Sequence, residues 1–334
     1  MVGIIGHGAY IPRYRIKAEE YVRVWGNFAP GIEEKTVCGY DEDTTTMAIE
    51  AADNAISRAQ IDPEKIKMVY FATTSSPYVE KLSSSTIATA VGAGQDVRTA
   101  DFAGSTKSGT EALLACFDAI SEYGLVVASD FPVGAPDDDN EHAYGAGAAA
   151  FVIGDGNPVV TLEKSYSVSG EVLGERFRKV GEIYIQDLGL RTSQFPIFIR
   201  RSLKGLIKEL GEVEINHVIL QQPDGEAFRA VREFKFTDIQ LRGGLVAQTG
   251  DTGAASVLLS LANVLDQAKP GERILIASYG SGAGSDSLSL VVHDEVEKMG
   301  EKPTVKEQLE EKEYIDYVTY LKFRKVLSTF GGDK

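Results

Sequence analysis

The chain has 334 residues, 43% of them hydrophobic and 25% charged, a composition typical of a globular protein large enough for two core-bearing halves. Its formal net charge of −15 argues against a surface for nucleic-acid phosphates. No apolar run reaches the roughly 18 residues of a membrane span, and residues 1–6 read as a strand rather than a signal peptide. Two cysteines, Cys38 and Cys116, indicate a reducing compartment without disulfides or metal spacing, so we expect a cytoplasmic protein.

The first part of the chain alternates strands and helices. After the opening strand, an amphipathic helix with Asp43 as its N-cap is predicted over 43–60. A buried strand at 68–72 then runs into the polar sequence 73–78, and a second helix, rich in small residues, is predicted over 84–93.

The small-residue turn at 100–110 is the centre of the pattern, because a strand ends there and a helix over 106–120 begins. Small residues let the backbone approach a ligand closely, the free N–H groups of a helix start favour negative charge, and activated nucleophiles often lie at such turns. Spacing alone favours the plainer interpretation of an ordinary turn whose Ser and Thr cap the helix. A strand at 124–129 follows, and the Gly- and Ala-rich run 145–154 is expected to pack tightly between layers.

The second part repeats this plan. Its predicted elements are a helix at 198–210, a strand at 217–220, a turn at 221–225, a helix at 226–234, a turn at 245–256 leading into a helix over 252–267, a strand at 273–278 and a glycine loop at 280–285. Two halves, 1–160 and 161–334, are therefore predicted, with the central helices 106–120 and 252–267 side by side under the join. Ligands are expected where the strand ends of the two halves meet.

Several motifs are specific enough to suggest a family. They are residues 8–16, 41–44, 100–102 with Lys107 and 109–110, 134–136, 145–154, 278–286, 314–317 and 320–322. Through them the chain resembles the thiolase superfamily, and within it the archaeal-type 3-hydroxy-3-methylglutaryl-CoA synthases, over nearly its whole length. The resemblance implies an α/β thiolase-like fold with layers α-β-α-β-α and two pseudo-repeated halves. It also implies acyltransferase chemistry on a coenzyme A thioester, with no metal and no further cofactor.

The catalytic positions of that family hold other residues in this chain. The family has a nucleophilic cysteine directly before the lysine of the central turn, where this chain has Thr106. It has a histidine before the Gln/Asn-Pro of the second-half turn, where Gln221 stands, and a general acid–base glutamate in the turn before Pro-Tyr, where Thr74 stands. An asparagine commonly follows the glycine before the second central helix, and here Asp251 replaces it.

These replacements remove the usual chemistry. A threonine hydroxyl ionises far less readily than a thiol at a helix start and needs an adjacent base. Gln221 accepts no proton at a useful pH, and Thr74 cannot carry one to and from a carbon acid. The best remaining nucleophile is Thr106 or Ser105, and Asp251 is expected to be the only titratable group near the join.

Other residue types are less promising for catalysis. Cys116 lies on the apolar face of the central helix and is expected to be a buried hydrophobe. Cys38 lies in a Val-Cys-Gly-Tyr loop that we expect to be exposed, with no base beside it. His142 follows a run of acidic residues and is expected in a solvated loop.

Binding residues are expected in two places. The small residues Gly280, Ser281, Gly282 and Gly284 suit the wall of a thioester cavity, although such a loop can also simply turn the chain. Lys107, Lys204 and Lys208 are candidates for the phosphates of coenzyme A, although any one of them can equally be a surface charge.

Three functions stay open. The first is a synthase-like acyltransferase with altered residues. The second is a non-catalytic acyl-CoA-binding or scaffold subunit, since the resemblance implies assembly with a thiolase and a small OB-fold protein. The third is an acyltransferase acting on another acceptor through Thr106 or Ser105. A homodimer is also implied, and the small-residue runs 88–94 and 145–150 suit close packing across a two-fold axis.

Overall fold

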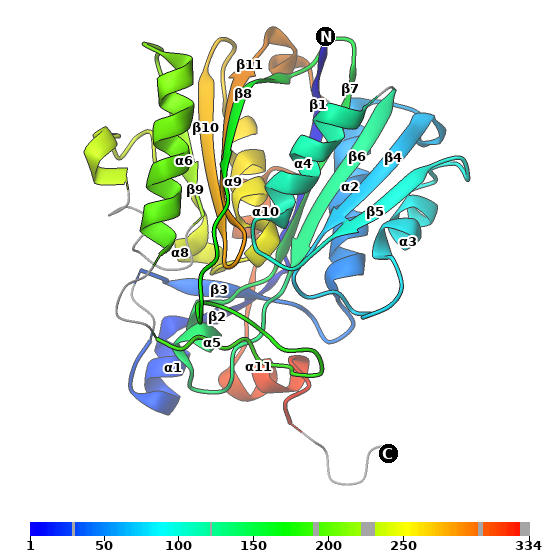
Figure 1. Ribbon diagram of the computed structural model, residues 1–334. Coiled ribbons are helices and arrows are strands. Elements are labelled where there is room, and N and C mark those ends of the chain that lie inside the picture. The colour runs from blue at the N-terminus through cyan, green and yellow to red at the C-terminus, as the bar shows by residue number, and fades with distance from the viewer. Residues whose placement is uncertain (29–30, 121, 190–193, 222–230, 300–302, 328–334) are drawn as a thin grey trace.

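The computed structural model describes residues 1–28, 31–120, 122–189, 194–221, 231–299 and 303–327 (Figure 1). Nine of the described strands form one mixed sheet in the order β5-β4-β6-β7-β1-β8-β11-β10-β9. Their bounds are β1 Val2–Tyr10, β4 Ile66–Ala72, β5 Arg98–Phe102, β6 Tyr123–Asp130, β7 Gly147–Asp155, β8 Val160–Val168, β9 His217–Leu220, β10 Arg273–Gly280 and β11 Gly284–Val292.

The sheet consists of two equivalent halves that meet at β1 and β8. Outward from the join the first half runs β1-β7-β6-β4-β5 and the second runs β8-β11-β10-β9. In each half an antiparallel pair, β6–β7 or β10–β11, is followed by a parallel neighbour, β4 or β9. The halves join through the antiparallel register pair Ile4 and Val160. This arrangement confirms the predicted pseudo-repeat, while the exact boundary at residue 160 stays a prediction.

Helices cover both faces of the two half-sheets (Figure 1). The outer face of the first half carries α2, Thr44–Ala59, and α3, Ser83–Ala90, and the outer face of the second carries α6, Phe195–Leu210. The helices α4, Ser108–Ala119, and α9, Ser256–Leu265, lie between the half-sheets. The layers are therefore α-β-α-β-α, as predicted.

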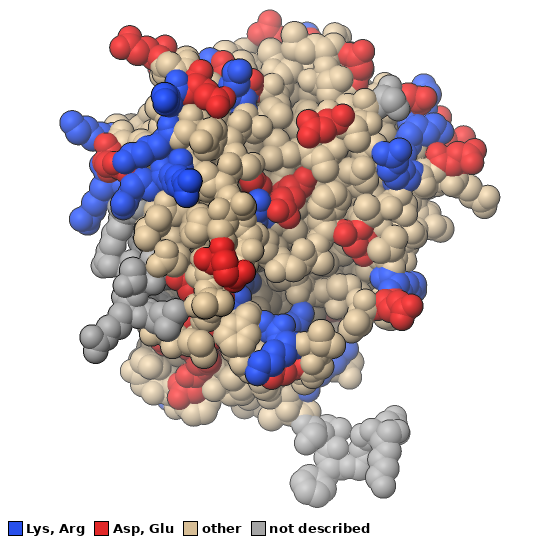
Figure 2. Space-filling view, in the orientation of Figure 1, with Lys and Arg blue, Asp and Glu red and all other residues tan. Residues whose placement is uncertain are grey.

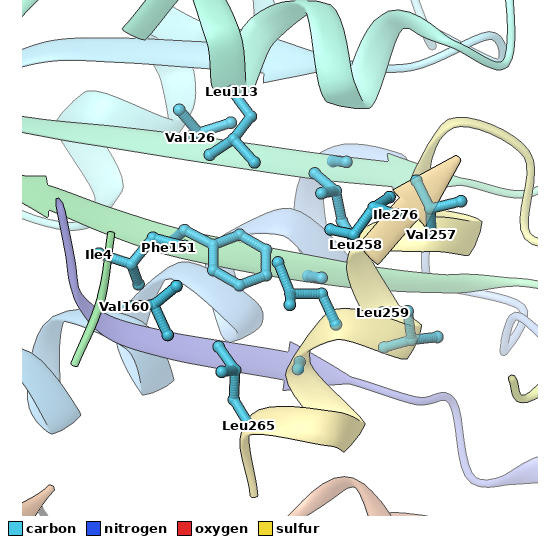
Figure 3. Close-up of a cluster of buried hydrophobic side chains, with 14 of the residues drawn as sticks. Ile4, Leu113, Val126, Phe151, Val160, Val257, Leu258, Leu259, Leu265 and Ile276 are labelled. Carbon is cyan, nitrogen blue, oxygen red and sulfur yellow. The ribbon is translucent and has the colours of Figure 1, made fainter. Parts of the chain in front are cut away.

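Alternation along the strands divides the core between these layers. On β4, Met68 and Tyr70 face the central layer, whereas Val69 and Phe71 face α2 and α3. Figure 3 shows the central cluster, in which Leu113 of α4 and Leu258 of α9 lie near Phe151 of β7. All of these side chains are buried, so the two halves share one continuous hydrophobic core.

Two local features fix the helices that flank the join. Asp43 caps α2, because its carboxylate accepts from the N–H groups of Thr45 and Thr46 at 2.8 and 2.9 Å. The start of α4 approaches the 3-10 turn η3, Gly253–Ala255, so closely that a Cβ on Gly109 would lie 2.3 Å from the Ala254 carbonyl oxygen. The central helices therefore pack side by side, as predicted.

A second, three-stranded sheet lies below the large one in Figure 1, in the order β12-β2-β3. The remaining elements are β2 Tyr14–Lys17, β3 Glu34–Val37, β12 Glu313–Tyr314, α1 Ala18–Trp25, α5 Asp139–Ala143, α8 Val246–Thr249, α10 Val305–Glu310, α11 Tyr317–Phe323, and the 3-10 turns η1 Pro63–Lys65, η2 Arg232–Phe234 and η4 Asp294–Lys298. Because β12 pairs with β2, the last described elements of the chain return to the N-terminal region.

Two expectations need correction. The helix predicted over 252–267 is divided between η3 and α9. The run 145–150, expected to pack across a two-fold axis, is buried instead, and its residues 147–150 belong to β7, which lies between β6 and β1 and has no free edge. Of the predicted turn at 221–225 and helix at 226–234, residues 222–230 lie outside the described residues.

Candidate functional site

The central turn joins β5 to α4 and carries Ser105 and Thr106. The Lys107 N–H donates to Ser105 Oγ at 3.3 Å and the Ser108 N–H donates to the Ser105 carbonyl oxygen at 3.1 Å, so Ser105 orders the turn before α4. The N-cap residue of the helix is Lys107, which makes no side-chain cap bond. Thr106 is buried, and its hydroxyl donates to the carbonyl oxygen of Tyr279 at 2.6 Å. The turn of the first half is thus bonded directly to β10 of the second.

Gly280 makes this approach possible. A Cβ at that position would lie 2.5 Å from Ser105 Oγ and 3.0 Å from Lys107 Cβ. Only glycine therefore lets the end of β10 lie against the central turn.

The sequence 73–76 continues β4, and Asp130, at the end of β6, holds it in place. The Thr74 hydroxyl donates to Asp130 Oδ2 at 2.6 Å, and the Thr74 N–H donates to the same oxygen at 3.1 Å. Ser75 also donates to Asp130, and the Ala254 N–H does so at 2.9 Å. Asp130 is fully buried, so this carboxylate connects the strand ends of the first half to η3 of the second.

Gln221 and Asp251 form the corresponding group in the second half. Gln221 follows β9, and its Nε2 donates to the Gly253 carbonyl oxygen at 3.2 Å, with Asp251 Oδ1 at 3.5 Å. Asp251 is fully buried; its Oδ1 accepts from the Gly253 N–H at 2.9 Å and its Oδ2 pairs with Arg176 Nη1 at 2.5 Å. Gln221 therefore lies beside Asp251, as a shared site requires.

Contacts with β10 relate the two groups. The Thr106 hydroxyl bonds the carbonyl oxygen of Tyr279, and the Gln221 N–H bonds that of Ala277 at 2.8 Å. Because two residues of a strand span about 7 Å, Thr106 Oγ1 and Gln221 N lie within about 13 Å of each other. The two residues therefore lie closer together than the predicted limit of about 15 Å, while their sharing of one catalytic crevice stays a prediction.

A pocket of about 310 Å³ opens between the halves at these strand ends. Its lining includes Thr74, Ser105, Thr106 and Ser281, which were predicted, and Arg176 and Arg178, which were not. Among the residues that the structure describes, Gln221 and Asp251 do not line this pocket; they lie behind Arg176.

Sequence comparison finds relatives over the whole length of the chain. A hydroxymethylglutaryl-CoA synthase of Methanopyrus kandleri is 40% identical over 343 residues, which cover 98% of this chain and 98% of that protein. One of Methanocaldococcus jannaschii is 39% identical over 343 residues, covering 97% of this chain and 99% of that protein. The chain belongs to the hydroxymethylglutaryl-CoA synthase family. No family model matches the sequence.

Solved structures of the same family share the fold. An HMG-CoA synthase complexed with CoA superposes with a TM-score of 0.84 at 20% identity, over 96% of this chain and 89% of that one. The curacin-pathway HMG synthase in complex with acetyl donor-ACP gives a TM-score of 0.82 at 21% identity, over 96% and 88%. These likenesses confirm the thiolase-like fold. The roles assigned to Thr106, Gln221, Thr74, Asp251 and Ser105 stay predictions.

The glycine loop of this family member contributes less than expected to the pocket. Ser281 lines the pocket, and its hydroxyl donates to the Glu175 carbonyl oxygen. Gly282 and Gly284, with φ of +70° and +97°, form the turn between β10 and β11 and are not among the described lining. Gly282 and Gly284 therefore turn the chain rather than form the wall of the pocket.

The three predicted lysines do not reach the pocket. Lys107 is buried between Asp286 and Glu111, at 3.1 and 3.0 Å; burial alone lowers its pKa, but the two carboxylates raise it more, so it stays charged. Lys204 and Lys208 are exposed on α6, where basic side chains gather (Figure 2), and Lys204 pairs with Glu233 at 2.8 Å. The geometry therefore does not favour binding of a coenzyme A phosphate by Lys107, whereas the exposed Lys204 and Lys208 are accessible to a phosphate.

Two expectations about other reactive residues were wrong. Cys38 is buried rather than exposed, against Met47. His142 does not lie in a solvated loop: it belongs to α5 and is fully buried between Tyr21 and Phe28. Cys116 is buried, as predicted.

Sequence reasoning missed Asp130, Arg176 and Arg178. Asp251 is therefore not the only titratable group near the join. The position of Asp130 at the end of a buried strand was a usable signal, since such strand ends converge. Arg176 and Arg178 lie in a segment without apolar periodicity, so only the tertiary structure reveals them.

Among the described helices, none is long and apolar enough to cross a membrane.

Proposed function

We propose that this protein binds a coenzyme A thioester in the pocket between its halves and lacks the usual condensation chemistry of its family. One observation carries the proposal: the Thr106 hydroxyl, at the position of the family nucleophile, donates its proton to a backbone carbonyl at 2.6 Å. A carbonyl oxygen is no general base, so this contact holds the hydroxyl without activating it.

The surroundings of Thr106 support the same conclusion. No cysteine or histidine is among the described residues of the pocket lining. Asp130 and Asp251 are each bonded to other groups, Thr74 and Ser75 in one case and Arg176 in the other. Neither carboxylate is hydrogen-bonded to Thr106 in the described part of the chain.

A non-catalytic role implies a partner that supplies the chemistry. The solved relatives include a synthase complexed with CoA and one complexed with an acetyl donor-ACP. The resemblance implies a cytoplasmic homodimer that assembles with a thiolase and a small OB-fold protein. A member with these replacements would hold the thioester in such an assembly. The alternative, acyl transfer through Thr106 or Ser105 to another acceptor, requires an ester on one of these hydroxyls.

Calorimetry with CoA and acetyl-CoA tests binding. We expect a Kd below about 1 mM. Ala103→Phe fills part of the pocket and should raise the Kd at least about tenfold. Ala90→Phe, an equal change on the exposed side of α3, is the control and leaves the Kd unchanged. No binding to the unaltered protein would contradict the ligand class.

Intact-mass measurement after incubation with acetyl-CoA tests chemistry. We expect no added acetyl group. An ester mapped by peptide sequencing to Thr106 or Ser105 would replace the non-catalytic proposal with the acyltransferase alternative.

A further inference from the structure

The short helix α5 is bonded at its C-terminal end to the buried group of the second half. The Ala143 carbonyl oxygen accepts from the Asp251 N–H at 2.7 Å, and the Gly145 N–H donates to the Asp251 carbonyl oxygen at 3.0 Å. The Tyr144 ring centre lies 4.5 Å from the guanidinium carbon of Arg176, which lines the pocket and pairs with Asp251. A movement of α5 would therefore break contacts that hold both Asp251 and Arg176.

The same helix also lies against the small sheet, α1 and α11 (Figure 1). Lys35 of β3 is fully buried, and its Nζ donates to the carbonyl oxygen of Glu141, one of the last carbonyl groups of the helix. The Glu141 carboxylate accepts from the Tyr317 hydroxyl of α11 at 3.0 Å and from the Asp137 N–H at 2.9 Å. These bonds fix α5 in one position against the rest of the protein.

His142, the next residue of α5, is fully buried without a polar partner. Its ring centre lies 4.6 Å from that of Tyr21 and 5.4 Å from that of Phe28, on which it is stacked. Neither of its ring nitrogens has a hydrogen-bond partner in the part of the chain that the structure describes. The site therefore suits a neutral imidazole better than a charged one, which would be buried with two unpaired N–H donors.

The charges near His142 do not offset this burial. The charged and titratable groups around it are Tyr21 of α1, Lys35 of β3, Tyr317 and Tyr320 of α11, Arg324 directly after α11, and Asp137, Asp138, Asp139 and Glu141 of its own segment. Burial and, to a smaller extent, Lys35 lower the pKa of His142 by more than the three aspartates raise it.

We propose that His142 is a pH-sensitive switch of the pocket. When its ring takes up a proton, α5 moves away from Tyr21 and Phe28 so that the charged ring meets water, and Asp251 and Arg176 lose their contacts with the helix. This inference rests on the proposed function only for the effect of the movement on a bound thioester, because the movement itself needs no ligand.

The direction of the pH dependence follows from the two forms. The closed form keeps His142 neutral, whereas an open form with the ring in water protonates it below about pH 6.5. Protons therefore favour the open form, and the ratio of open to closed molecules should rise by up to about tenfold for each pH unit below about 6.5. Above that pH the ratio should stay constant.

Hydrogen–deuterium exchange followed by mass spectrometry measures this opening at the Gly145 and Asp251 amides, whose hydrogen bonds join α5 to the second half. Divided by the intrinsic rate at each pH, both exchange rates should rise about tenfold from about pH 7.5 to about 5.5. Both should also exceed the rate of the Phe151 amide in the middle of β7, because the opening of α5 is local rather than global.

His142→Phe places a neutral ring in the same site and should abolish this rise. The matched control is His293→Phe, which changes a half-buried histidine just after β11 and should keep the rise. If His142→Phe does not fold, His142→Leu gives the same comparison.

Three results would overturn the switch. The first is exchange at Gly145 and Asp251 that does not change with pH, and the second is an unchanged rise in His142→Phe. The third is an equal rate at Phe151, which would mean that these amides exchange only by global unfolding.

Acetyl-CoA separates the switch from the proposed function. At about ten times its Kd it should slow exchange of both amides about tenfold, because it binds the closed form. Opening that depends on pH without this protection would uphold the switch and contradict its effect on the thioester. If acetyl-CoA does not bind at all, the proposed function fails, while the exchange rates without ligand still decide whether His142 is a switch.

Discussion

Hydroxyl groups in the pocket are oriented by the protein before any ligand arrives. Thr106 donates to Tyr279, Thr74 to Asp130 and Ser281 to Glu175. Each hydroxyl proton is thereby engaged, and each oxygen keeps its lone pairs as acceptors. Together with the arginines, these oxygens make the pocket a binding surface with fixed polarity rather than a set of activated nucleophiles.

Neither cysteine should react in the native protein. Burial raises the pKa of Cys116 to about 12 and also raises that of Cys38, so almost no thiolate forms near neutral pH. Iodoacetamide at pH about 8 should add no mass to the folded protein, while both thiols should react in denaturant. Rapid labelling of folded protein at either cysteine would contradict their burial.

His142 should make stability fall toward acid. Its ring nitrogens have no partners among the described residues, and burial, with a smaller effect of Lys35, lowers its pKa. The folded state therefore keeps His142 neutral, whereas the unfolded chain protonates it below about pH 6.5. Since the unfolded state then binds the extra proton, the free energy of unfolding should decrease by up to about 1.4 kcal/mol per pH unit below 6.5.

Urea unfolding at several pH values, compared with His142→Phe, measures this contribution. The phenylalanine should remove it and flatten the curve between about pH 6.5 and 5. The control His293→Phe changes a half-buried histidine just after β11. Identical pH curves for His142→Phe and the unaltered protein would show that this histidine does not titrate on unfolding.

The elements that hold the pocket are strand ends fixed by close backbone contact. Their existence could be predicted, because β4, β6, β9 and β10 are short apolar runs and α2 has an apolar face and an Asp43 cap. Their contacts could not, since nothing local in the sequence says that the central turn touches Gly280. The segment with Arg176 was missed for the same reason: its residues are held by tertiary bonds to Asp251 and Tyr144.

Gly109→Ala should loosen the contact between α4 and η3. Alanine normally stabilises a helix by about 1 kcal/mol over glycine, but here its Cβ would meet a backbone oxygen at 2.3 Å that cannot move independently. The clash should win, with a net loss of about 1–3 kcal/mol in the free energy of unfolding. Urea denaturation measures it.

The matched control is Gly94→Ala, in a loop where the nearest contact would be 3.9 Å away and the backbone φ suits alanine. It should be neutral or stabilise by up to about 1 kcal/mol. If Gly109→Ala proves as stable as this control, the two central helices are not held at the distance the structure shows.

At the scale of the whole molecule, the site belongs to neither half alone. Thr74 and Thr106 come from the first half and Gln221 from the second, joined through β10 and Asp251. The resemblance located these positions along the chain, and their convergence follows from the repeat. The two arginines of the pocket lining, Arg176 and Arg178, could not be predicted in this way, because the overall composition is acidic.

Restoring the family residues at all three positions should restore some condensation. Thr106→Cys supplies a thiol at a helix start, and Gln221→His supplies a proton acceptor. Thr74→Glu places a carboxyl group beside Asp130, and the negative charge of Asp130 should raise the pKa of the new carboxyl group toward the range useful for acid–base catalysis. Because such residues act as a unit, single changes should stay within about threefold of background and the triple should exceed it about tenfold or more. Acetoacetyl-CoA consumption with acetyl-CoA is the measurement, and Thr106→Ser with the other two changes is the control that lacks the thiol. A folded triple variant that binds CoA and stays at background would mean that the cavity itself has diverged, which would favour a partner subunit or a different substrate over a disarmed synthase.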